Sequence, residues 1–208
     1  VPQTGMGLTD STFPSKGEIR ALVILVNYAD VKFNTPNAQD YFTRLMNEEG
    51  FSDNGATGSS RDYYIASSNG QFRPIFDVVG PVDLPNNRSY YGGNNTYGND
   101  AHPADMVIQA CQLLDDEVDF SLYDANDDGF IDNIYVFYAG AGEASGGPSD
   151  SVWPHSWDVF SAGGQNHRFD GKTLNHYACS NEWMPLYVPA GPDGIGTFVH
   201  EFSHVMGL

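Results

Sequence analysis

The sequence predicts an α/β domain in which helices pack on a mixed, twisted sheet. Two apolar runs rich in β-branched and aromatic residues, at 20–27 and 133–139, are typical of buried central strands. Segments with helical spacing lie between and after these runs, so strands and helices intermix along the chain. The 208 residues contain no internal repeat and no linker, and we therefore expect one domain spanning residues 1–208.

The first half of the chain begins with the strand at 20–27. A helix is predicted for residues 37–48, because Phe42, Leu45 and Met46 fall on one side of it. A Gly/Ser-rich loop then leads into a short helix at 61–66.

A second strand is predicted at 75–79. Proline cannot donate a hydrogen bond to a neighbouring strand, so we expect Pro81 and Pro85 to end it. Residues 85–100 are rich in Asn, Gly and Tyr, and are predicted to form a long surface loop.

The second half contains a helix at 103–116, which Pro103 begins, and the strand at 133–139. A hairpin turning at Asp170-Gly171 is predicted for residues 167–180. The last element is a helix at 197–206, with Thr197 as its N-cap.

Composition excludes several classes of partner. Nine basic residues stand against 27 acidic ones, giving a formal charge of −18, which disfavours binding to nucleic acid or to anionic membranes. No apolar run reaches the roughly 18 to 20 residues needed to span a bilayer. Because the chain begins with Val1, we expect a processed form of an exported protein. Cys111 and Cys179 could form a disulfide or remain two buried thiols.

The motif with the clearest chemistry is His-Glu-Phe-Ser-His at residues 200–204. On a helix, His200 and His204 lie on one face, about 5 to 6 Å apart at Cβ, and can bind one zinc ion. Glu201 then lies beside a zinc-bound water, whose pKa falls to about 7, and can act as the general base. The alternative is a helix that carries two solvated histidines by chance.

A catalytic zinc needs a third protein ligand. Gly207 can adopt a left-handed conformation that turns the chain back toward the metal. We expect the third ligand beyond Leu208, supplied by the remainder of the same polypeptide.

A second motif is typical of calcium loops. Asp124, Asn126, Asp128 and Asp132 place side-chain oxygens at the spacing of such a loop, Phe130 would contribute its carbonyl, and glycine occupies the sixth position. The twelfth position is tyrosine instead of the glutamate of an EF-hand. The alternative is an Asx-rich turn without a metal.

These features together give the chain a family resemblance. It resembles metallopeptidase family six, the immune inhibitor A type of secreted bacterial proteases. The resemblance covers most of the chain, from about residue 20 to the end. It rests on the segments 21–30, 60–80, 124–157 and 200–208.

The resemblance implies a metzincin-like catalytic domain that is secreted, binds zinc and calcium, and cleaves proteins or peptides. It also implies that a C-terminal subdomain is missing here. We further expect an extended substrate to pair with a free strand edge near Tyr177, Ala178 and Cys179.

Two other functions remain open from the sequence. The first is a zinc hydrolase with a different substrate, such as a glycoprotein or a non-protein amide. The second is a calcium-stabilised adhesion or binding module that retains an inactive peptidase-like fold.

Overall fold

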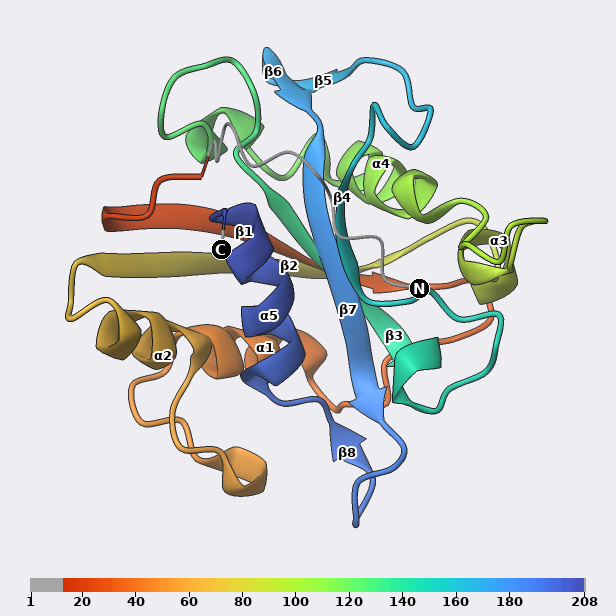
Figure 1. The fold of residues 1–208 in the computed structure, drawn as a ribbon, viewed down its shortest axis with the longest axis horizontal. Helices are drawn as coiled ribbons and strands as arrows, with labels where there is room; N and C mark the ends of the chain where they lie inside the picture. The colour runs from red at the N-terminus through yellow and green to blue at the C-terminus, as the bar shows by residue number, and fades with distance from the viewer. Residues whose placement is uncertain (1–12, 208) are drawn as a thin grey trace.

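The computed structural model describes residues 13–207, and a six-stranded mixed sheet forms the centre of the molecule (Figure 1). The strands lie in the order β2-β1-β3-β7-β4, and β8 pairs with the end of β7. β4 and β8 run antiparallel to β7, whereas the other pairs in the sheet are parallel. The predicted α/β class with a mixed sheet is confirmed. These strands are β1 (Gly17–Asn27), β2 (Phe72–Asp83), β3 (Ile134–Ala141), β4 (His155–Asp158), β7 (His176–Met184) and β8 (Gly191–Pro192).

Helices cover both faces of the sheet. One face packs against α1 (Ala38–Asn47), α2 (Ser60–Ser67) and α5 (Ile195–Val205). The other face packs against α4 (Pro103–Leu114) and the short α3 (Arg88–Gly92). Short 3-10 helices lie in the connections, at η1 (Asp53–Gly55), η2 (Phe120–Tyr123) and η3 (Glu143–Ser145). None of the helices within residues 13–207 combines the length and apolarity needed to cross a bilayer.

The central strand β1 shows why the apolar runs in the sequence are continuous. Leu22, Ile24 and Val26 point into the core under α4, while Val23 and Leu25 point into the core under α1 and α5. Successive side chains of a strand face opposite sides, so a strand covered on both sides must be apolar throughout.

The predicted end of the second strand is wrong. β2 continues to Asp83 and includes both Pro74 and Pro81. Its only strand partner in the described sheet is β1, so it is an edge strand, where a missing N–H costs little. The register with β1 shifts between Ile24 and Val26, so the irregular part of the pairing lies at Pro81. The predicted loop at 85–100 is also partly helical, because it contains α3.

The predicted hairpin at 167–180 is correct only at its tip. β5 (His167–Phe169) and β6 (Lys172–Leu174) form an antiparallel pair, and Asp170 and Gly171 between them both have positive φ, as a tight hairpin turn requires. Residues beyond 175 leave the hairpin and enter the main sheet as β7. Cys111 and Cys179 are both buried and not bonded to each other.

Candidate metal centre

Helix α5 is held by its aromatic side. Phe198 and Phe202 are fully buried, and their rings lie 5.3 Å apart. The Phe198 ring lies 4.4 Å from that of Tyr135 on the central strand β3. From α2, the Tyr64 hydroxyl donates to the Val199 carbonyl at 3.2 Å. These contacts fix which side of the helix faces outward.

The outward side carries both histidines of the predicted zinc motif. The rings of His200 and His204 have centroids 4.8 Å apart and planes 81° apart. Both residues are exposed, and one ligand atom from each of His200, Glu201 and His204 can be chosen so that all lie within 4.8 Å of one another. Between residues 13 and 207, this is the one group of three or more His, Cys, Asp or Glu side chains with such spacing.

Glu201 lies in a different environment from its two neighbours. It is 8% exposed, and burial raises the pKa of its carboxyl group, while the two histidines act in the opposite direction. Its Oε1 lies 4.0 Å from His200 Nε2. A partly desolvated carboxylate with a raised pKa is suited to accepting a proton near neutral pH.

Both ends of α5 are defined by local contacts. The helix begins after Gly194, not at Thr197, because the Asp193 side chain accepts hydrogen bonds from the Gly194 N–H at 2.8 Å and the Thr197 hydroxyl at 2.8 Å. At the other end Gly207 has φ +80° and its N–H donates to the His204 carbonyl, as predicted for a C-terminal cap. The predicted third ligand lies outside the described residues.

The prediction of a free strand edge at residues 177–179 is wrong. Tyr177, Ala178 and Cys179 are fully buried in β7, which pairs with β3 on one side and β4 on the other. Both sets of backbone groups are therefore used within the sheet. The outermost strand on this side, among the residues that the structure describes, is β4.

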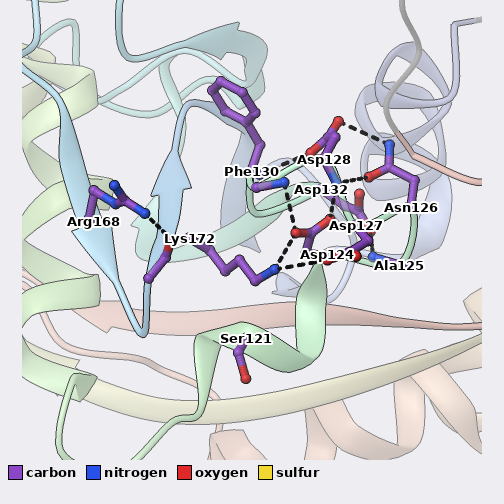
Figure 2. A network of polar contacts seen from close by, with 12 residues as sticks. Ser121, Asp124, Ala125, Asn126, Asp127, Asp128, Phe130, Asp132, Arg168 and Lys172 are labelled. Atoms are coloured by element: carbon purple, nitrogen blue, oxygen red, sulfur yellow. Dashed lines mark hydrogen bonds and ion pairs between the residues drawn. The ribbon is translucent and has the colours of Figure 1, made fainter.

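The predicted calcium loop connects η2 to β3 (Figure 2). Asp124 Oδ1 accepts from the Asp128 N–H at 3.0 Å, and Asp124 Oδ2 accepts from the Gly129 N–H at 2.9 Å. Asn126 donates to Asp128 Oδ2 at 3.0 Å, and the Phe130 N–H donates to Asp128 Oδ1 at 2.9 Å. Backbone N–H groups of the loop thus point to its own side-chain oxygens, and no three of its carboxylates form a group that could hold one ion.

Asp132 is the most unusual side chain of this loop. It is 1% exposed, its Oδ2 accepts from the Ala125 N–H at 2.8 Å, and its Oδ1 has no hydrogen-bond partner in the described part of the chain. Burial, together with the nearby charges of Asp124 and Asp128, raises the pKa of Asp132 to about 7. A buried carboxylate oxygen without a donor is costly, and a bound cation is one way to satisfy it.

Two residues that matter here were not identified from the sequence. Glu182 is fully buried and accepts hydrogen bonds from the segment that follows β1. Lys172 places its ammonium group 2.6 Å from Asp124 Oδ2. Both contacts join segments distant in the chain, so no local sequence pattern marks them.

Comparison with known proteins gives a consistent result. The sequence model described as "Immune inhibitor A peptidase M6, catalytic domain" matches residues 12–208. The chain is also similar to the Pre-pro-metalloprotease PrtV of two Vibrio cholerae serotype O1 strains, at 24% identity in each case. These alignments cover 91% of this chain but 24% of the relatives, so the chain spans about a quarter of their length.

Proposed function

The chain belongs to the immune inhibitor A family of M6 peptidases, and from this membership we propose that it is the catalytic domain of a secreted, zinc-dependent endopeptidase. The family and the relatives support a metalloprotease. The identity of the metal, the roles of individual residues and secretion are our proposal. Membership of a peptidase family does not favour an adhesion module that retains an inactive fold.

The observation that carries the proposal is the arrangement of three side chains on α5. His200 and His204 project from the outward side within reach of one ion, and Glu201 lies beside them in a drier environment. Imidazole nitrogens suit zinc, and two of them one helical turn apart fit two positions of a tetrahedral site. We expect the third ligand beyond Leu208, after the left-handed Gly207 has redirected the chain. We also propose that the domain is metzincin-like, because in such proteins the chain turns back after this glycine and brings the third ligand to the metal.

In the proposed reaction, the two histidines hold the metal and Glu201 transfers a proton. A zinc ion held there would supply Lewis-acid chemistry for the substrate carbonyl and for the attacking water. His200 and His204 would hold the ion through their imidazole nitrogens. Glu201 accepts the proton of the attacking water and then delivers it to the amine that leaves. Burial raises the pKa of Glu201, which makes the carboxylate a stronger base for the proton that it accepts.

The substrate is an extended peptide that pairs with the outer edge of β4, in place of the edge first expected at residues 177–179. β4 is paired with β7 along one side, and it lies at the end of the described sheet. It also contacts α5, so a peptide on that edge lies next to the metal-binding helix. An added strand gains backbone hydrogen bonds without requiring a particular side-chain sequence. A peptide-bound structure that lacked backbone hydrogen bonds to β4 would rule this out.

The loop at residues 124–132 is proposed as a second, structural cation site of the calcium type. The unsatisfied oxygen of buried Asp132, next to Asp124 and Asp128, supports it. Oxygen donors from carboxylates, an amide and a carbonyl are the ligands that calcium prefers.

The proposal is tested with a form of the protein that extends past Leu208. After removal of metal by a chelator, hydrolysis of an unstructured protein should be absent, and zinc should restore it while magnesium should not. His200→Ala and His204→Ala should each abolish both zinc binding and hydrolysis. Hydrolysis that survives in either variant at full rate would refute the zinc assignment.

A further inference from the structure

Lys172 extends from the neighbouring strand β6 against the acidic loop (Figure 2). Its Nζ lies 2.6 Å from Asp124 Oδ2 and 3.5 Å from Asp127 Oδ1. The Lys172 side chain is 20% exposed and that of Asp124 is 0% exposed. Salt screens such a contact much less than it screens a surface ion pair.

One ammonium group does not neutralise this loop. Residues 124–132 contain four aspartates, and within residues 13–207 the Oδ1 of the buried Asp132 lacks any hydrogen-bond partner. Asp124 and Asp128 both act electrostatically on that carboxylate. The unsatisfied oxygen lies in the interior and in a region of excess negative charge, which points to a cation beyond Lys172.

The carboxylate of Asp124 cannot pair with Lys172 and bind a second cation equally well. Its Oδ2 accepts from both Lys172 and the Gly129 N–H, and its Oδ1 accepts from the Asp128 N–H. Calcium needs six to eight oxygens at about 2.3 to 2.6 Å, and the first aspartate of a loop of this type is one of its ligands. An ammonium group against the same carboxylate would repel a divalent ion at close range.

We propose that Lys172 competes with a divalent cation of the calcium class for the loop at residues 124–132, and that it must leave Asp124 for the cation to bind at full affinity. The inference rests on the calcium part of the proposed function and adds a control on it. Either the Lys172 ammonium group or a divalent cation from solution occupies the loop. Lys172 therefore lowers the affinity of the loop for the divalent cation.

The backbone around Lys172 allows the side chain to be replaced without detaching the strand. The Thr173 N–H donates to the Gly129 carbonyl at 2.9 Å, and the Ile131 N–H donates to the Thr173 carbonyl at 2.9 Å. These bonds join β6 to the loop whatever side chain occupies position 172. Lys172→Met keeps most of the length and the apolar stem while removing the charge.

The test is calcium titration by calorimetry, with calcium chloride as the probe, on the whole protein that carries this chain. Lys172→Met should bind calcium about tenfold more tightly or better than the unchanged protein, because a close positive charge has been removed. Lys172→Arg retains the charge and should stay near the unchanged affinity. Arg168→Met is the matched control: it removes a positive charge from the same hairpin, but Arg168 contacts the Gly171 carbonyl and not the loop, so affinity should change less than about threefold.

The outcomes separate the two proposals. Equal or weaker calcium binding by Lys172→Met, with binding retained in the unchanged protein, overturns the competition but leaves the calcium loop in place. The lack of calcium binding in both proteins at millimolar calcium overturns both proposals. Adding Asp124→Asn to Lys172→Met should abolish the heat of calcium binding. Calcium binding that survives this change would place the ion elsewhere and overturn the competition. Thermal unfolding gives a second readout, since calcium should raise the Tm of Lys172→Met more than that of the unchanged protein.

Discussion

Glu182 is a buried carboxylate whose replacement should be costly although it lies outside the metal centre. Its Oε1 accepts from the Thr35 hydroxyl at 2.6 Å, the Thr35 N–H at 2.8 Å and the Asn34 N–H at 3.0 Å. Its Oε2 accepts from the Gly140 N–H at 3.0 Å and the Asn34 amide at 3.4 Å. One side chain on β7 thereby holds the segment after β1 and the end of β3.

The cost of Glu182→Gln follows from these partners. Glutamine replaces one acceptor oxygen with an NH2 group, so at least one N–H donor that faces the carboxylate loses its acceptor, and the remaining bonds lose their charge assistance. A buried donor left without an acceptor costs about 1–3 kcal/mol, and weakening charge-assisted bonds adds to this. We therefore expect the free energy of unfolding to fall by about 2–4 kcal/mol.

Urea denaturation measures this change. The matched control is Glu117→Gln, the same chemical change at an exposed position, which should alter stability by less than about 0.5 kcal/mol. If Glu182→Gln unfolds at the same urea midpoint as the control, the carboxylate is not what holds these segments together.

Three further predictions concern the core, a close backbone contact and pH. Phe198→Ala should lower the free energy of unfolding by about 3–5 kcal/mol, whereas Leu186→Ala, at a residue that is 70% exposed, should change it by less than about 0.5 kcal/mol in the same thermal melts. Gly92→Ala would place a Cβ 2.3 Å from a backbone nitrogen and should lower the Tm clearly, while Gly196→Ala, whose Cβ meets nothing within 4 Å, should not. Burial raises the pKa of Asp100 to about 6, so the folded state binds this proton more tightly than the unfolded chain does. Stability should therefore fall as pH rises from about 4 to 6, by at most about 3 kcal/mol from this group, and Asp100→Asn should flatten the fall measured by urea denaturation across that range.

Local patterns predicted most of the fold. The helices predicted at 37–48, 61–66 and 103–116 correspond to α1, α2 and α4, and the strand at 133–139 corresponds to β3. Apolar spacing and caps act over one or two turns and can therefore be read from neighbouring residues.

The predictions were wrong where the structure of a segment depends on the strand that pairs with it. Pro81 is tolerated in β2 because β2 is an edge strand, and edge position is a property of the whole sheet. Residues 177–179 were expected at an edge, yet β4, which precedes them by about 20 residues in the chain, pairs outside them. Sequence alone does not give strand order.

The site residues likewise fall into those that local spacing predicted and those that depend on the tertiary fold. Spacing along one helix placed His200, Glu201 and His204 together without any knowledge of the fold. The contact between Lys172 and Asp124 and the anchoring role of Glu182 need the tertiary arrangement, since each joins residues far apart in sequence.

The central claim is that Glu201 transfers protons while the two histidines bind the metal. The most direct measurement is zinc content together with peptide hydrolysis for Glu201→Gln, in a form of the protein that extends past Leu208. We predict that zinc is retained in full while kcat falls by about 10²–10⁴-fold, the range for loss of a general base. Turnover close to that of the unchanged protein, with zinc bound, would contradict the account.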